Sequence, residues 1–512
     1  MRQSGFSKLT KDIIFNKLLR FGFFPEDASN ILSSDEFCNY VIRNEKQVSN
    51  LTGPNEIAKY CQFKLTRNNN SPRYLGIIHP YQYIKLATAI RTSWGELTRT
   101  NKTRIVRNGK SVIKAQLDNA TGRLVSLKSQ KNYDPDELSF TDNDAKRINI
   151  QIGSNYRVKA DIANFYPSIY THSVTWVKYG REAGYEKKDT RNSLNTIDQL
   201  LRSCQDRETI GIPVGPDTSA IVAEYILTGV DDYLRGYKYL RFIDDYECYC
   251  NSHTEAEKFI IDLSAALEKF RLRLNTKKTE ITQSPFTINP RWLTSIKLFQ
   301  SLVTDIIKEQ HLDRVISFLD NAVFMSSKYP FDSPLKYTIK ILSNSTYEDF
   351  DTFLTIAKYV FHITTQYPYL ISTCSDFVDI GYKQFSENTK KIDVHVRNFL
   401  NIMIKIHSKY RRSDVLSWTV SIAIRHGLQL NYAAINEIVA AQDCVSTLFA
   451  FKYQYDNKDV TSSYPDKEAD TSWWLYTYEK HLLTKTKYIL KGPLFNFLND
   501  LLAHDISFIK LP

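Results

Sequence analysis

The sequence is poor in residues that interrupt regular structure, because its 512 residues include only 17 glycines and 16 prolines. This scarcity excludes a loop-rich or low-complexity architecture. No run of about 18 or more apolar residues occurs, so no membrane-spanning helix is expected. The opening residues MRQSGFSKLTKDIIF lack the apolar stretch of a signal peptide. The sequence therefore predicts a cytoplasmic protein that does not enter a membrane.

Cysteine is also scarce, and its distribution does not suggest a disulfide framework. The seven cysteines are odd in number and mostly scattered: Cys38, Cys61, Cys204, Cys248, Cys250, Cys374 and Cys444. We expect reduced thiols. The pair Cys248-x-Cys250 has no second cysteine or histidine pair nearby, so half-buried strand cysteines are favoured over a metal site.

Positive charge is in excess, with a formal net charge of +11, and this favours a polyanionic partner. Residues 101–130 have a single acid, Asp118, and these bases: Lys102, Arg104, Arg107, Lys110, Lys114, Arg123 and Lys128. The alternative is a solvated hairpin that turns at Asn108-Gly109. The 32 tyrosines offer many faces on which bases could stack, although most tyrosines pack in the core or on the surface.

The chain divides near residue 290. Residues 1–100 show mainly helical apolar spacing, and residues 156–290 mix an alternating strand from 156, a helix at 218–234, a hairpin at 237–250 and a helix at 255–272. Beyond residue 290 the spacing is helical throughout, for example at Leu312, Val315, Ile316 and Leu319. We predict an α+β protein with a mixed domain at 1–290 and an all-α domain at 291–512, built as a bundle or as a solenoid of helix pairs.

Two local signals mark helix ends in the second domain. Ser345-x-x-Glu348 has the spacing of a capping box before the apolar residues that start at Phe350. Gly427 follows the helical spacing of Leu416, Val420 and Ala423, in the place where a helix would end.

The stretch RFIDDYECYC sets two carboxylates, Asp244 and Asp245, inside a hairpin pattern. One interpretation is a turn, since Asp is a common turn residue. The other is a metal site, because Asp161 follows the strand YRVKA, the stretch GIPVGPDTS enters a helix, and LRLNTKKT carries paired lysines. Mg²⁺ prefers carboxylate and carbonyl oxygens, and nucleotidyl transfer uses two such ions. We therefore predict a two-metal site for Mg²⁺ or Mn²⁺, with Asp161 and Asp244 as bridging ligands, the Ile162 carbonyl as a further ligand and Asp245 as an auxiliary carboxylate.

These four blocks resemble motifs A to D of the reverse transcriptases. DIANFYPSI is similar to motif A, IPVGPDTS to motif B, FIDD to motif C and LRLNTKKT to motif D, and the likeness covers residues 70–285. The stretch DIANFYPSIYTHS and the phenylalanine that leads motif C are most similar to the abortive-infection (Abi) reverse transcriptases of bacteria. The length and helical tail look closest to the short members carried by P-two-type prophages.

The resemblance implies a fingers and palm domain followed by a HEAT-like helical-repeat domain in the place of the thumb. It implies that Tyr166 crowds the sugar 2′ position, although a core aromatic is the alternative. It implies that Lys278 protonates the pyrophosphate leaving group, with Lys277 as its close neighbour. Pro213 and Gly215 of motif B would contact the substrate. Arg73 would contact the triphosphate, unless it is an ordinary surface arginine.

One departure concerns templating. Reverse transcriptases that copy a template usually have glutamine in motif B, where this chain has Val214. The Abi family polymerises deoxynucleotides (dNTPs) without a template and primes from its own protein. The resemblance thus implies single-stranded DNA linked covalently to a tyrosine, a homo-oligomer (trimer or hexamer) and a role in phage defence in the bacterial cytoplasm. The alternatives are a template-directed RNA-dependent DNA polymerase and a non-enzymatic nucleic-acid-binding scaffold. In the helical tail, Trp418, Trp473 and Trp474 would stack on bases or fill the core.

Overall fold

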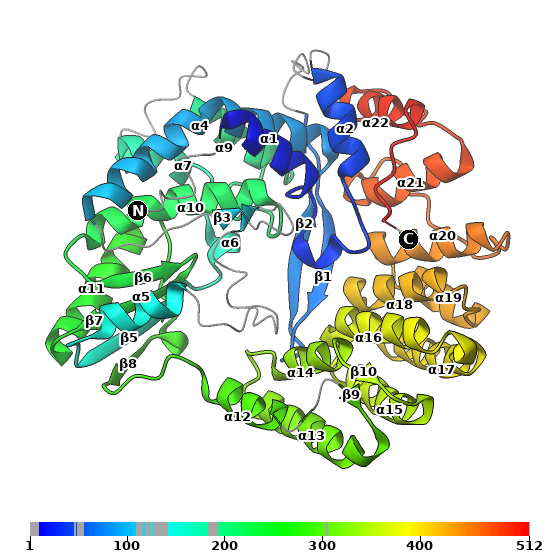
Figure 1. Ribbon diagram of the computed structural model, residues 1–512. Helices are drawn as coiled ribbons and strands as arrows, with labels where there is room; N and C mark the ends of the chain where they lie inside the picture. Colours follow the sequence, from blue (N-terminus) through cyan, green and yellow to red (C-terminus); the bar gives the residue numbers. More distant parts are fainter. Residues whose placement is uncertain are drawn as a thin grey trace.

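The computed structural model describes residues 10–45, 48, 56–108, 116–117, 124–125, 142–182, 193–301, 303 and 306–510. In Figure 1 the mixed half of the chain lies on the left, and the C-terminal helices follow an arc along the bottom and right. A two-stranded hairpin, β1 (Cys61–Thr66) and β2 (Pro72–Ile77), stands between the two halves. The arc is closed where the C-terminal end meets the N-terminal segment, since Ser33 N donates to Phe508 O at 2.8 Å.

The mixed half is built around one antiparallel sheet, called the central sheet below. Its strand order is β6 (Tyr239–Phe242), β7 (Asp245–Cys250), β5 (Tyr156–Asp161) and β8 (Glu280–Gln283). The alternate residues Val158 and Ala160 of β5 are buried, as a strand with one core-facing side requires. The predicted strand from residue 156 and the predicted hairpin at 237–250 are confirmed.

Helices pack around this sheet (Figure 1), and several of them precede it in the sequence. The other elements of this half are α1 (Lys11–Arg20), η2 (Glu26–Ala28), α2 (Asp35–Arg43), α4 (Pro80–Asn108), β3 (Gln116–Leu117), β4 (Leu124–Val125), α5 (Asp142–Gln151), α6 (Phe165–Ser168), α7 (Ser173–Tyr179), α9 (Ser193–Ser203), α10 (Asp217–Asp231), η5 (Asp232–Leu234), α11 (His253–Lys269) and η6 (Thr276–Lys278). The helices predicted at 218–234 and 255–272 correspond to α10 and α11. The helix α11 begins where the Ser252 side chain accepts a hydrogen bond from Glu255 N.

The hairpin predicted to turn at Asn108-Gly109 is wrong in its first strand, because residues up to Asn108 belong to α4. Once a helix is nucleated, each further residue adds a hydrogen bond, and this outweighs a local turn signal. A short antiparallel pair does form further along, between β3 and β4. Most of the basic segment 101–130 lies outside the described residues or has no described side chains.

The C-terminal half is almost entirely helical. Its elements are α12 (Arg291–Gln300), β9 (Ile306–Ile307), η7 (Glu309–His311), α13 (Leu312–Lys328), α14 (Pro334–Ser343), β10 (Thr346–Tyr347), α15 (Phe350–Gln366), η8 (Pro368–Leu370), α16 (Ile371–Gln384), η9 (Ser386–Asn388), α17 (Thr389–His407), η10 (Ser408–Tyr410), α18 (Ser413–Arg425), α19 (Tyr432–Ala440), α20 (Cys444–Asp456), η11 (Thr471–Trp473), α21 (Trp474–Thr484) and α22 (Pro493–Ala503). From α15 to α20, each helix contacts the next but one, as in α16 with α18 and α18 with α20, and most neighbouring helices also contact each other. A HEAT-like repeat stays a prediction.

Of the two predicted helix ends, one is confirmed and one is wrong. Gly427 follows the end of α18 with a φ of 63°. The capping box at Ser345 does not form, because the Ser345 hydroxyl donates to Ile341 O of the preceding helix. The N-cap of α15 is Asp349, whose carboxylate accepts from Thr352 N at 2.7 Å. An ionised Asp next to the helix also suits the positive end of its dipole.

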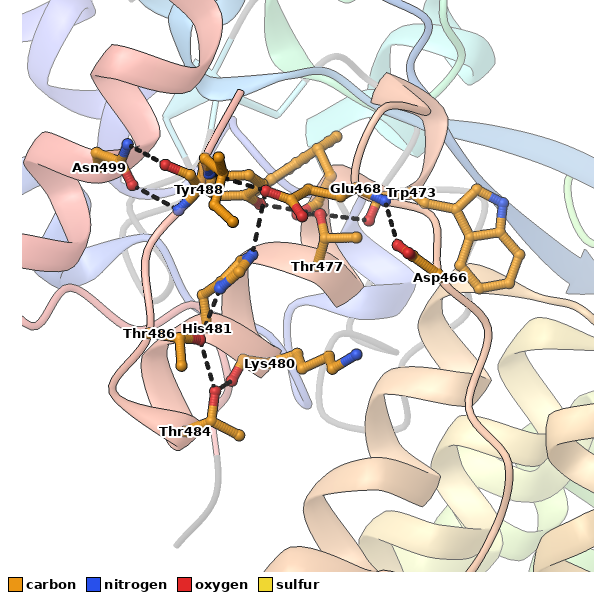
Figure 2. Close-up of polar contacts among 12 residues, drawn as sticks. Asp466, Glu468, Trp473, Thr477, Lys480, His481, Thr484, Thr486, Tyr488 and Asn499 are labelled. Atoms are coloured by element: carbon orange, nitrogen blue, oxygen red, sulfur yellow. Dashed lines mark hydrogen bonds and ion pairs between the residues drawn. The ribbon is translucent and has the colours of Figure 1, made fainter. Parts of the chain in front are cut away.

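The last two helices are held together by a polar network (Figure 2). Tyr488 and Asn499 exchange two hydrogen bonds, and the Tyr488 hydroxyl lies 2.9 Å from Thr477 Oγ1. His481 Nδ1 lies 2.7 Å from Thr486 Oγ1. The three tryptophans considered for base stacking are buried: Trp418, Trp473 and Trp474. They belong to the core.

All seven cysteines are buried and reduced, as expected. Cys248 and Cys250 lie in β7, and they are fully rather than half buried. Within the part of the chain that the structure describes, no helix is both long and apolar enough to span a membrane.

Glu479 in α21 is a buried carboxylate whose charge opposes folding. It accepts a hydrogen bond from Phe508 N at 2.5 Å, and burial raises its pKa to about 7. A carboxyl with a raised pKa stabilises the fold most at low pH, and this contribution is lost as the pH rises from about 4.5 towards 7. We expect Glu479→Gln to reduce the loss of stability between pH 5 and pH 8 by on the order of 2 kcal/mol. Urea unfolding at both pH values measures this, with Glu348→Gln, an exposed carboxylate, as the control. An unchanged difference for Glu479→Gln would contradict the assignment.

Candidate active site

Three aspartates lie at one end of the central sheet. Asp161, the last residue of β5, is paired directly opposite Asp245, the first residue of β7. Residues paired in this way project their side chains from the same face of a sheet. Asp244 precedes Asp245 in the turn, and its carbonyl accepts a hydrogen bond from Ile162 N at 3.1 Å. The strand register thus brings together Asp161, Ile162, Asp244 and Asp245, all of which the sequence had singled out.

Asp244 sits in a two-residue turn of unusual conformation. Phe242 pairs with Asp245, so Ile243 and Asp244 alone form the turn. Ile243 has a φ of 56°, in the left-handed region that β-branched residues rarely adopt. Such conformations persist only where the surroundings enforce them, and they concentrate at functional sites. The turn is therefore compatible with both interpretations of the paired aspartates. It is a hairpin tip, and it carries a carboxylate that a metal site would need.

A buried arginine holds this turn in place. Arg241 in β6 donates from Nη1 to the carbonyl of Ile243 at 3.1 Å. The same guanidinium makes ion pairs with Asp231 at 2.8 Å and Glu224 at 2.9 Å, both on α10. Burial opposes the charge of Arg241, but the two carboxylates raise its pKa well above its ordinary value. The side chain is only 1% exposed, so the charge is fully held by these partners.

Asp161 has polar partners on both of its oxygens. Asn275 Nδ2 donates to Oδ1 at 3.0 Å, and Lys278 Nζ donates to Oδ2 at 2.9 Å. The main chain joins the same two segments, since Asn275 N donates to the carbonyl of Asp161 at 2.8 Å. The structure therefore places Lys278 at the carboxylates, while Lys277 has no interaction with them that the structure records.

The loop of residues 211–216, called the motif B loop below, is fixed from three sides. Ile212 N donates to the carbonyl of Tyr166 at 3.1 Å, and Gly76 N donates to the carbonyl of Val214 at 2.8 Å. Gly215 has a φ of 118°, and a Cβ there would lie 2.7 Å from Pro25. This close approach excludes any larger residue. The loop packs Pro213 against Gly76 of β2 in the same way.

The pKa values of Tyr166 and Arg67 both respond to the charge of Asp244. Burial, and then the negative charge of Asp244, raise the pKa of Tyr166, while Arg73 acts in the opposite direction. Partial burial and the charge of Arg73 lower the pKa of Arg67, which Asp244 raises. The β1–β2 hairpin therefore carries two guanidinium groups that act electrostatically on this site, Arg67 with Asp244 and Arg73 with Tyr166. Arg67 was not predicted.

These residues fit a site for Mg²⁺ or Mn²⁺. No group of three or more ligating side chains (His, Cys, Asp or Glu) gathers around one point in the described residues. Mg²⁺ however needs only one or two carboxylates when substrate phosphates and waters complete its shell. The Asp161 oxygens already face two donors, one of them cationic. A carboxylate that stabilises an ammonium group is suited to a metal ion as well.

One family of known proteins matches the part of the chain that contains this site. Residues 99–289 match the family of reverse transcriptases (RNA-dependent DNA polymerases). No curated protein sequence matches the chain. Among solved structures, a telomerase from Candida albicans, in complex with a fragment of telomeric RNA, is 10% identical with a TM-score of 0.25, over 71% of this chain and 69% of that one. An apo telomerase from Candida tropicalis is 10% identical with a TM-score of 0.27, over 79% and 77%. Likenesses at this level carry no functional argument.

The matched range contains Asp161, Tyr166, Asp244, Asp245 and Lys278. It forms a reverse-transcriptase domain. The protein is accordingly an enzyme, a nucleotidyltransferase of the reverse-transcriptase type. This domain occupies 191 of the 512 residues, since the match runs from 99 through 289, and the helical half lies beyond it.

Proposed function

We propose that the protein is a phage-defence DNA polymerase of the bacterial cytoplasm that joins deoxynucleotides without a template. Synthesis starts on a tyrosine of the protein itself, so the product is single-stranded DNA covalently attached to the chain. The working form is a homo-oligomer, a trimer or a hexamer. This proposal follows the resemblance to the abortive-infection reverse transcriptases, and it is finer than the family match, which supports a reverse-transcriptase-type polymerase.

Val214 is the observation that carries the template-independent part. It lies in the motif B loop, where reverse transcriptases that copy a template usually have glutamine. Its side chain is half buried, and its carbonyl is held by Gly76 N at 2.8 Å. A valine side chain neither donates nor accepts hydrogen bonds, so it cannot position a templating base by that means.

In the proposed reaction, each residue of the site has one role. Asp161, Asp244 and the Ile162 carbonyl would hold two Mg²⁺ or Mn²⁺ ions, which when bound polarise the attacking and leaving oxygens. Asp245 supports them. A hydroxyl oxygen forms a bond to the α-phosphorus and loses its proton to a solvent water, while the bond to the bridging oxygen of pyrophosphate breaks. Lys278 donates a proton to that leaving group.

The nucleotide is held from the side opposite the carboxylates. Arg73 and Arg67 on the β1–β2 hairpin bind the triphosphate, because guanidinium groups pair well with phosphate oxygens. Pro213 and Gly215 of the motif B loop contact the base or sugar. Tyr166 closes the space beside the sugar 2′ position, since it is buried next to Asp244 and fixed through its carbonyl by Ile212 N.

The role of Tyr166 predicts a change in sugar selectivity. Tyr166→Val opens space at the 2′ position, so the preference for dNTPs over rNTPs should fall by roughly 10- to 100-fold. The ratio of kcat/KM values for dATP and ATP measures this, and it does not depend on the fraction of folded enzyme. Tyr166→Phe keeps the ring and should keep the preference. Equal ratios for Tyr166→Val and the wild type would mean that Tyr166 is a core residue only.

The sequence of the product tests template independence. Purified enzyme would receive all four dNTPs and Mg²⁺ or Mn²⁺, with poly(rA), poly(rU) or no added strand, and the products would be sequenced. We expect one and the same composition in all three reactions. The second candidate function is a template-directed RNA-dependent DNA polymerase, which the description of the matched family favours. Products complementary to the added strand would establish that function instead.

Mapping the linked peptide identifies the priming tyrosine. Nuclease would trim the DNA, and the tryptic peptide that retains a nucleotide would be sequenced by mass spectrometry. A primer must present its hydroxyl to solvent, so the first candidates are the exposed tyrosines among the described residues: Tyr74, Tyr233, Tyr410, Tyr432 and Tyr455. Tyr133 and Tyr185, which lie outside the described residues, are further candidates.

A further inference from the structure

The β1–β2 hairpin, which carries Arg67 and Arg73, is bonded along both edges to other parts of the protein. Along β2, Gly76 N donates to the carbonyl of Val214 in the motif B loop. Along β1, the amides of Lys64 and Thr66 point away from β2 and donate to the helical domain. A free hairpin would instead leave the amides of an edge strand open to solvent.

The bonds on the β1 side come from the start of α18. Lys64 N donates to Ser413 Oγ at 2.9 Å, and Thr66 N donates to Asp414 Oδ2 at 2.7 Å. The Thr66 hydroxyl adds a bond to Asp414 Oδ1 at 3.0 Å. Asp414 is only 3% exposed, and its other partner is Val415 N at 2.8 Å. The carboxylate thus satisfies the start of its own helix and holds a strand more than 340 residues away in sequence.

A second bond fixes the hairpin just past the same arginine. Asn68 Nδ2 donates to the carbonyl of Asp332 at 2.9 Å, in the connection between α13 and α14. Weaker contacts of that amide reach Ser326 O and Tyr329 O. Arg67 therefore has a neighbour on each side, Thr66 and Asn68, that is bonded to the helical domain. The path of the main chain at Arg67 depends on both.

We propose that Asp414 is a positioning residue for nucleotide binding, which acts through Thr66 to fix the main chain that carries Arg67. The helical domain then sets the affinity of the polymerase site for the triphosphate. This inference rests on the proposed function, because it takes Arg67 as a triphosphate contact. It adds a task for the helical domain that is independent of binding the DNA product and of assembly.

The test measures KM and kcat of Asp414→Asn separately, because the proposal predicts a change in KM alone. In Asp414→Asn one carboxylate oxygen becomes an amide that cannot accept a bond, so the loop around Arg67 is held less firmly. We expect KM for dNTP to rise about five- to tenfold, with kcat within about twofold, because the interaction is made equally in the ground and transition states. Asn68→Ala should raise KM in the same way. If Asp414→Asn folds poorly, Asn68→Ala still tests the proposal, because Asn68 is only partly buried.

The matched control is Asp349→Asn. Asp349 also accepts a hydrogen bond at the start of a helix of the same domain, and no bond links it to the hairpin. It should lower the melting temperature to a similar extent and leave KM unchanged. A rise in KM for Asp349→Asn equal to that of Asp414→Asn would mean that any loosening of the helical domain has this effect, and would overturn the proposal.

A double-mutant cycle separates the inference from the proposed function. If Asp414 acts through Arg67, then Asp414→Asn should not raise KM further in an Arg67→Ala background. If the double variant raised KM by the product of the two separate factors, the inference would be overturned. It would also be overturned if Asp414→Asn left KM unchanged in an enzyme whose KM responds to Arg67→Ala. Absence of dNTP incorporation by the wild-type protein would instead contradict the proposed function.

Discussion

Asp244→Asn should reduce nucleotide incorporation by at least about a thousandfold while the protein stays folded. The substitution keeps the shape of the side chain and removes the negative charge at the tip of the β6–β7 hairpin. Loss of a metal-ligating charge removes several kcal/mol of transition-state stabilisation, and each 1.4 kcal/mol corresponds to about a factor of ten. The main-chain bond from Ile162 N to the Asp244 carbonyl does not involve the side chain, so the turn itself should survive.

The control for this prediction is Glu280→Gln. Glu280 belongs to the same central sheet, where it is paired opposite Lys159 of β5, but its side chain is 59% exposed and its ion pair is long, at 3.9 Å. Exposed pairs of this kind contribute little. Incorporation should stay within about twofold of the wild type. If Asp244→Asn retained a tenth of the wild-type rate, the carboxylate would not be the metal ligand proposed for it.

Arg241→Met should cause the largest loss of stability, roughly 3–5 kcal/mol, because it leaves the buried carboxylates of Asp231 and Glu224 without their cation. Urea unfolding measures the change. Activity should fall by more than the unfolded fraction explains, since the carbonyl of Ile243 loses its donor and the turn that presents Asp244 is released. Adding Asp231→Asn and Glu224→Gln to Arg241→Met should recover part of the stability, because the unpaired charges are then gone.

Arg235→Met provides the matched comparison. Arg235 also pairs with an aspartate, Asp232, at 2.8 Å, but the arginine is 57% exposed. Its loss should cost about 1 kcal/mol or less, as for other surface ion pairs. A similar small loss for Arg241→Met would mean that the buried network does not hold the turn.

The carboxylates of the site could be predicted because their signals are local. Strand alternation places Asp161 at the end of β5, and a short turn between two apolar stretches places Asp244 at a hairpin tip. The order of the four blocks then suggested that these residues come together, and the pairing of Asp161 with Asp245 brings them to one end of the sheet.

The supporting residues could not be predicted, because they depend on contacts between distant segments. Arg67 interacts electrostatically with Asp244 because the β1–β2 hairpin carries it at the turn of residues 67–71. The asparagine-rich sequence of that turn is the one local signal for it. Arg241 interrupts the apolar pattern YLRF, which indicates a buried charge that needs partners. No local pattern, however, could assign those partners to α10, or assign Asp414 to β1.

The two incorrect local predictions have a common cause. Ser345 and Asn108 both carry polar side chains that suit helix starts or turns, and both were assigned from short patterns. In the structure the preceding helix determines each outcome, since α14 takes the Ser345 hydroxyl and α4 continues through Asn108. Helix propagation explains Asn108, which lies in α4. Ser345 lies beyond the end of α14 at Ser343, and its hydroxyl bonds back to that helix instead of capping the next one.

We propose that this reverse-transcriptase domain starts DNA synthesis on its own chain. The most direct test incubates the purified protein with labelled dNTPs and Mg²⁺ or Mn²⁺, without template or primer, and separates the products on a denaturing protein gel beside Asp244→Asn. We expect label that migrates with the wild-type chain, is released by protease and is absent from the variant. Label that appears only after template and primer are added, and never on the protein, would contradict it.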